Sequence, residues 1–125
     1  MDEERVRYDV DHSVIVIEVP AHVSNPVFDR CRARMMSLPG FTPDTPVLVD
    51  WTGINQREMT PQLVRDRATT PWPVTARIAF YAPTDVLFGL ARMYVLQSAQ
   101  EMEAFRTLGE ALAWLAAPRT NADAA

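Results

Sequence analysis

The chain has 125 residues and a formal net charge of -4, with 48% hydrophobic and 22% charged residues. This size and composition are typical of one soluble globular domain, and no apolar run reaches the ~20 residues that a membrane span requires. The acidic balance argues against nucleic acid and anionic membranes as partners. A single cysteine, Cys31, excludes an internal disulfide. The single cysteine and the lack of a signal-peptide pattern at the start together predict a cytoplasmic protein.

The basic residues narrow the chemistry, because all 12 are arginines and the chain contains no lysine. Lysine Schiff bases, lysine general bases and Walker-type phosphate loops are therefore excluded. His12 and His22 are not spaced as metal ligands, and no glycine-rich phosphate loop is present. We expect no enzyme, no metal and no cofactor.

The N-terminal part predicts a β-hairpin. A short edge strand at residues 5–8 is followed by a turn at 9–12 and by a β-branched, buried strand at 14–19. Pro20 ends that second strand.

A helix is predicted next, from Ser24-Asn25-Pro26 to Leu38. A capping side chain before a proline is typical of a helix start, and apolar residues then recur every three or four positions. Its polar side carries Arg30, Arg32 and Arg34, which we interpret as a solvated face rather than an anion-binding patch.

The remaining elements alternate between strand and helix. In chain order they are a strand at 47–51, a short helix from Thr60-Pro61, a strand at 77–82, a long helix from Thr84 to about Ala99, a strand at 103–106 and a helix at 108–117. The order β-β-α-β-α-β-α-β-α predicts an α/β fold with a single mixed, mostly parallel sheet and helices packed on it. We expect one domain over residues 1–118 and a disordered tail at 119–125.

Four segments carry a resemblance to a known family: Val49–Gly53, Arg77–Pro83, Phe88–Tyr94 and the run Phe-Arg-x-Leu-x-Glu-Ala-Leu-x-Trp-Leu at Phe105–Leu115. Together they resemble the bacterial SpoIIAA-like proteins, also described as STAS/CRAL-TRIO-like domains. The resemblance spans nearly the whole chain and implies a STAS-like fold. It also implies a non-catalytic regulatory or protein-interaction role.

The resemblance directs attention to the region after the central strand. STAS antagonists carry a phosphorylatable serine there, in an Asp-Ser-Ser-Gly stretch. Here the region reads Gly53-Ile-Asn-Gln-Arg-Glu-Met-Thr-Pro61, and Thr60 is the nearest hydroxyl. Thr60 is therefore a candidate switch residue, although a helix cap already accounts for a threonine before Pro61.

Asp50 and Trp51 are candidates for a ligand pocket, because they end a central strand and ligands of open α/β sheets bind beyond such ends. The alternative for Asp50 is a hydrogen bond to the amides of the turn that follows it.

The long helix from Thr84 is apolar over about twice the ~100° stripe that covering a sheet requires. Neighbouring helices cover both flanks, or one flank meets a protein partner or a second copy of the chain. We favour an interface, which makes a homodimer the expected assembly. The residues expected in it are Phe88, Arg92, Tyr94, Val95 and Trp72, the last of which could equally belong to the core.

A second hypothesis is a small apolar-ligand or lipid-binding domain. It requires a cavity of ~300 Å³ or more between the long helix and the sheet. The residues expected to line it are Phe80, Phe88, Met93 and Tyr94. An enzyme would instead require convergent polar groups in a cleft near Asp50.

Overall fold

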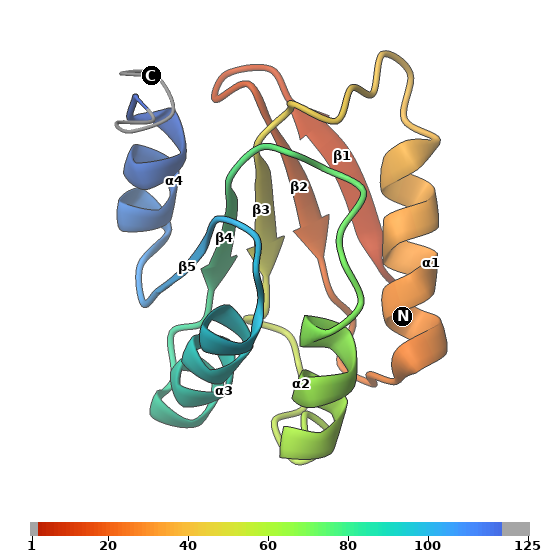
Figure 1. Ribbon diagram of the computed structural model, residues 1–125, viewed down its shortest axis with the longest axis vertical. Helices are drawn as coiled ribbons and strands as arrows, with labels where there is room; N and C mark the ends of the chain where they lie inside the picture. Colours follow the sequence, from red (N-terminus) through yellow and green to blue (C-terminus); the bar gives the residue numbers. More distant parts are fainter. Residues whose placement is uncertain (1–2, 119–125) are drawn as a thin grey trace.

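The computed structural model describes residues 3–118 as one five-stranded sheet with four helices (Figure 1). The elements are β1 (Arg5–Asp9), β2 (Val14–Glu18), α1 (Asn25–Met36), β3 (Val47–Asp50), α2 (Pro61–Ala68), β4 (Ile78–Tyr81), α3 (Asp85–Gln97), β5 (Met102–Phe105) and α4 (Leu108–Ala116). The predicted order of elements is confirmed. The predicted tail at 119–125 lies outside the described residues.

The strands lie in the sheet in the same order as in the chain, β1-β2-β3-β4-β5. β1 and β2 form an antiparallel hairpin, and β2 to β5 are parallel to their neighbours. The predicted class, a mixed and mostly parallel sheet, is therefore confirmed. Helices α2 and α3 lie toward the end at which the parallel strands finish (Figure 1).

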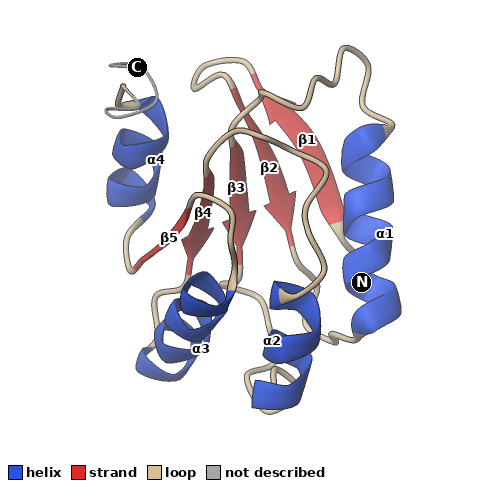
Figure 2. Cartoon of the chain, viewed as in Figure 1, coloured by secondary structure: helices blue, strands red, loops and turns tan. Residues whose placement is uncertain are grey.

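Helices cover both faces of the sheet, three on one face and one on the other (Figure 2). Side chains alternate along a strand, so Val47 and Val49 pack with residues of α1, α2 and α3. Leu48 packs on the opposite face with Ala111 and Leu115 of α4. Burial on both faces explains why the inner strands are almost continuously apolar.

Each helix begins at a hydroxyl side chain that accepts a hydrogen bond from the backbone N–H three residues later. These caps are Ser24, Thr60, Thr84 and Thr107. The predicted starts are therefore correct. The long helix is shorter than expected: α3 ends at Gln97, whereas the predicted end was near Ala99.

Thr60→Ala is expected to lower the free energy of unfolding by about 1 kcal/mol, because the N–H of Leu63 loses the Thr60 Oγ1 acceptor 3.2 Å away. Urea unfolding measures this difference. Thr60→Ser retains the hydroxyl and serves as the control. Equal losses in the two variants would contradict the cap as the role of this side chain.

Arg32 contradicts the expected solvated face of α1, because it is only 7% exposed. Its guanidinium donates to the carbonyl of Thr70 at 2.8 Å and to the hydroxyl of Tyr94 at 3.4 Å. It also lies over the Trp72 ring, 4.8 Å from the centroid. Arg32 is buried because the segment that follows α2 lies against this side of α1 and accepts hydrogen bonds through its carbonyls. Burial lowers the pKa of Arg32.

Arg30 and Arg34 are exposed, as expected. Both bind Glu4, a buried residue just before β1: Arg30 Nε lies 2.7 Å from its carboxylate, and Arg34 donates to its carbonyl at 2.8 Å. The hydrogen bond from Arg30 holds the pKa of the Glu4 carboxyl below its usual value. These contacts fix the start of the sheet to α1.

Candidate interaction surface

Helix α3 carries apolar side chains on the side that faces the sheet and also on a neighbouring flank. Leu87, Ala91 and Tyr94 face the sheet and are buried. A flank beside this buried side carries a row of apolar side chains at a spacing of three or four residues, in which the two end members are exposed and the two middle members pack partly against the core. We call this row the α3 stripe; it consists of Val86, Leu90, Met93 and Leu96.

The α3 stripe is open to solvent at both ends. Val86 is 50% exposed and Leu96 is 74% exposed, whereas Leu90 and Met93 are half-buried. Gly89 lies beside them, and a Cβ atom at this position would meet nothing within 4 Å. Packing within the chain therefore does not require this glycine, although glycine weakens a helix by roughly 1 kcal/mol relative to alanine. Gly89 leaves a notch in the stripe.

A shallow groove lies beside α3, where the start of α3, the end of β5 and the start of α4 meet. We call it the α3–α4 groove; Phe88, Ala104, Phe105, Arg106 and Glu110 line it. Its volume is about 190 Å³. That is below the ~300–1,000 Å³ of typical small-molecule sites. The groove has room for a side chain of a partner protein.

Arg106 forms one wall of the groove. Its guanidinium lies 4.5 Å from the centroid of the Phe88 ring and pairs with the carboxylate of Asp85. The side chains of Arg106 and Asp85 are both exposed to solvent. The Arg106 guanidinium therefore holds Phe88 in place while remaining accessible.

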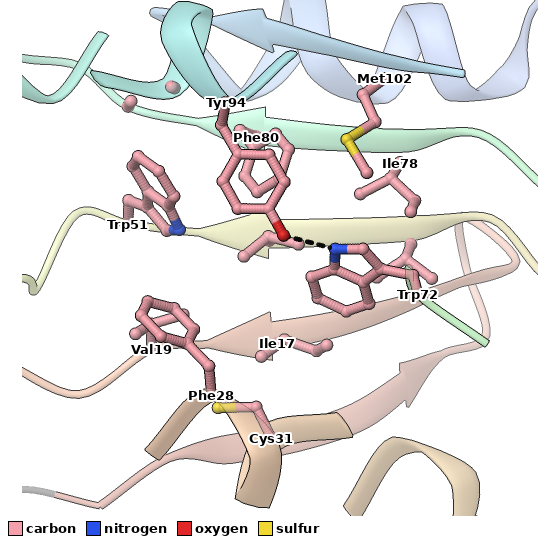
Figure 3. Packing of buried hydrophobic residues seen from close by; sticks show 14 of the residues in the cluster. Ile17, Val19, Phe28, Cys31, Trp51, Trp72, Ile78, Phe80, Tyr94 and Met102 are labelled. Carbon is pink, nitrogen blue, oxygen red and sulfur yellow. Dashed lines mark hydrogen bonds between the residues drawn. The ribbon is translucent and has the colours of Figure 1, made fainter. Parts of the chain in front are cut away.

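The five residues predicted for an interface lie in two different environments. Phe88, Arg92 and Val95 are half-buried on α3, and Arg92 pairs with Glu103 of β5. Tyr94 and Trp72 are buried in the core. The Trp72 indole donates to the Tyr94 hydroxyl at 2.9 Å (Figure 3). These two side chains therefore do not fit the prediction of a surface anchor, because each polar tip has its partner inside the chain.

The space predicted to hold an apolar ligand is filled by aromatic rings (Figure 3). The ring centroids of Trp51 and Phe80 are 5.1 Å apart, and those of Phe80 and Tyr94 are 4.8 Å apart. All three side chains are at most 2% exposed. The prediction of a ligand cavity between α3 and the sheet is therefore not supported, because the rings that would line it pack against one another.

The three remaining candidates serve local structure. Asp50 accepts a hydrogen bond from the backbone N–H of Thr52 at 2.8 Å, which is the predicted turn contact. Trp51 is buried in the core, and Thr60 caps α2. The thiol of Cys31 is buried as well, and desolvation raises its pKa to about 11, so it is not an activated nucleophile.

None of the four residues of the α3 stripe was among the residues that the sequence predicted for an interface. The sequence did contain the signal, because Val86, Leu90 and Met93 belong to the broad apolar arc of this helix. The sequence pattern did not reveal which part of that arc packs against the sheet. The sheet takes the sector of Leu87, Ala91 and Tyr94, which leaves Val86 and Leu96 exposed at the ends of the stripe.

The comparisons with known proteins concern the fold. No protein-family model and no curated protein sequence matches this chain. Its structure is similar to that of an uncharacterized protein of the DUF3478 family, with a SpoIIAA-like fold, from Shewanella loihica PV-4. The TM-score is 0.60 at 14% sequence identity, and the match covers 92% of this chain and 95% of the other. The chain therefore has a SpoIIAA-like fold.

Two further findings hold for residues 3–118. No helix there combines the length and apolar character needed to cross a membrane. No group of three or more His, Cys, Asp or Glu side chains in this part is arranged to hold a metal ion.

Proposed function

We propose that this chain is a non-catalytic, STAS-like protein-interaction domain with a regulatory role, and that a second copy of the chain is its partner. The observation that supports this proposal is the α3 stripe. A helix that covers a sheet needs one apolar side, and α3 carries in addition Val86 and Leu96, which are 50% and 74% exposed at the two ends of the stripe. Exposed apolar rows of this kind mark contact surfaces.

The stripe is suited to a symmetric contact. If two α3 helices pack antiparallel about a two-fold axis near Gly89 and Leu90, Val86 of one copy lies opposite Met93 of the other. The notch at Gly89 then receives Leu90 of the second copy. The same residues meet on both sides, which is what a homodimer with a two-fold axis requires.

The size of the surface sets the strength of the contact. Helix α3 has 13 residues. At 1.5 Å per residue it is only about 20 Å long. Two such helices bury less than the ~1,200 Å² of a standard interface, so we expect a reversible dimer with a Kd in the micromolar range. An association of this strength responds to concentration, which supports a regulatory role. The buried free thiol of Cys31 supports a cytoplasmic location.

Leu96→Asp is expected to raise the Kd of self-association by at least about tenfold, because it places a charge in the most exposed part of the stripe. Sedimentation velocity over a range of concentrations measures this change. Val10→Asp is the matched control, since Val10 is 77% exposed and lies in the β1–β2 turn. A wild-type chain that stays monomeric at high concentration, or equal weakening by both variants, would contradict the proposal.

A further inference from the structure

Strand β5 forms one edge of the sheet, since among the described residues it pairs only with β4. The N–H groups of Ile78 and Ala82 in and after β4 donate to the carbonyls of Glu101 and Phe105 at 3.0 and 2.9 Å. Backbone groups alternate in direction along a strand, so the N–H of Ala104 points away from β4. An outward N–H on an edge strand is a site at which another chain can add a strand.

The outward N–H of Ala104 is occupied by the side chain of the preceding residue. It donates to Glu103 Oε1 at 3.0 Å, and the same oxygen pairs with Nη1 of Arg92 on α3. The pleat alone would direct Glu103 toward the face covered by α4, as it does Phe105. Arg92 instead holds the carboxylate at the edge of the sheet.

We propose that Arg92 and Glu103 form an edge guard that prevents β5 from pairing with β5 of a second copy of the chain. An antiparallel pair of identical strands would be centred on Ala104, whose N–H and carbonyl would bond to Ala104 of the second copy. In the guarded state that N–H is taken, and the two Glu103 carboxylates would meet near the two-fold axis and repel each other. The guard confines self-association to surfaces other than the strand edge.

Glu103→Ala removes both the acceptor and the charge. Its self-association constant is expected to exceed that of the parent chain by about tenfold or more, measured as weight-average mass in sedimentation equilibrium. Glu110→Ala is the matched control, because it removes the same charge from the neighbouring groove and leaves the edge intact. Glu103→Gln keeps the shape of the side chain but loses the ion pair, and an intermediate increase is expected.

Amide hydrogen exchange at Ala104 gives a second measurement on the same samples. In dilute Glu103→Ala this amide is expected to exchange faster than in the parent, and to slow as concentration rises and strands pair. All variants are built in the Leu96→Asp background, so that association through the α3 stripe is weakened equally in every sample and the two proposals are tested separately. The edge guard is refuted if Glu103→Ala keeps the mass of its parent and exchange at Ala104 is independent of concentration.

Discussion

Trp51→Ala is expected to lower the free energy of unfolding by about 3–5 kcal/mol, the range for removing a large aromatic side chain from a core. Trp51 is 0% exposed and contacts the rings of Phe80 and Tyr94. These rings join the sheet to α3, and alanine leaves a cavity that rigid neighbours cannot fill. Guanidinium unfolding followed by far-UV circular dichroism measures the loss.

Trp51→Phe is the control that separates packing from hydrogen bonding. The Trp51 indole N–H is buried without a hydrogen-bond partner among the described residues. Phenylalanine keeps most of the ring contacts and removes that polar group, so its cost should be well under half that of alanine. A loss of equal size in both variants would show that the indole itself, and not the ring packing, stabilises this region.

Arg32→Ala is expected to lower the free energy of unfolding by about 2–3 kcal/mol, because it leaves buried acceptors without a donor. The guanidinium binds the carbonyls of Thr70 and Pro71 and the hydroxyl of Tyr94, and thereby connects α1 to the segment after α2 and to α3. It also supports the indole of Trp72. Thermal unfolding of the purified variant measures the loss.

Two further variants define what Arg32 contributes. Arg65→Ala, at an exposed position of α2, removes the same side chain from solvent and should change stability by less than about 0.5 kcal/mol. Arg32→Lys keeps the charge but loses the planar fork that reaches several acceptors, so it should cost nearly as much as alanine. Full stability in Arg32→Lys would show that charge alone is needed.

Most of the fold could be predicted from the sequence, because its signals are local. A hydroxyl residue before the first helical turn, with proline among the first two helical positions at two of the four helices, marked the helix starts. Continuous β-branched runs marked the buried strands, and their alternation with helices implied parallel pairing. Most ends of the helices and strands lie within one or two residues of the predicted positions.

The positions of individual side chains were harder to predict, because they depend on which elements meet in space. Arg32 has the sequence context of a solvated residue, and only the segment after α2 makes it buried. Trp72 and Tyr94 each have an apolar body and a polar tip, a combination that suits a core as well as an interface. Their hydrogen bond to each other places them in the core.

The sequential strand order has a consequence for how the protein forms during synthesis. Each strand pairs with one that has already left the ribosome, so the sheet can grow one strand at a time as each hairpin or helical crossover is completed. The face that carries Val16, Leu48 and Ala79 is different, because within residues 3–118 it is covered by α4, the last of the described elements. A nascent chain therefore exposes an uncovered apolar sheet face until Leu108–Ala116 emerges, and this interval is when aggregation competes most strongly with folding.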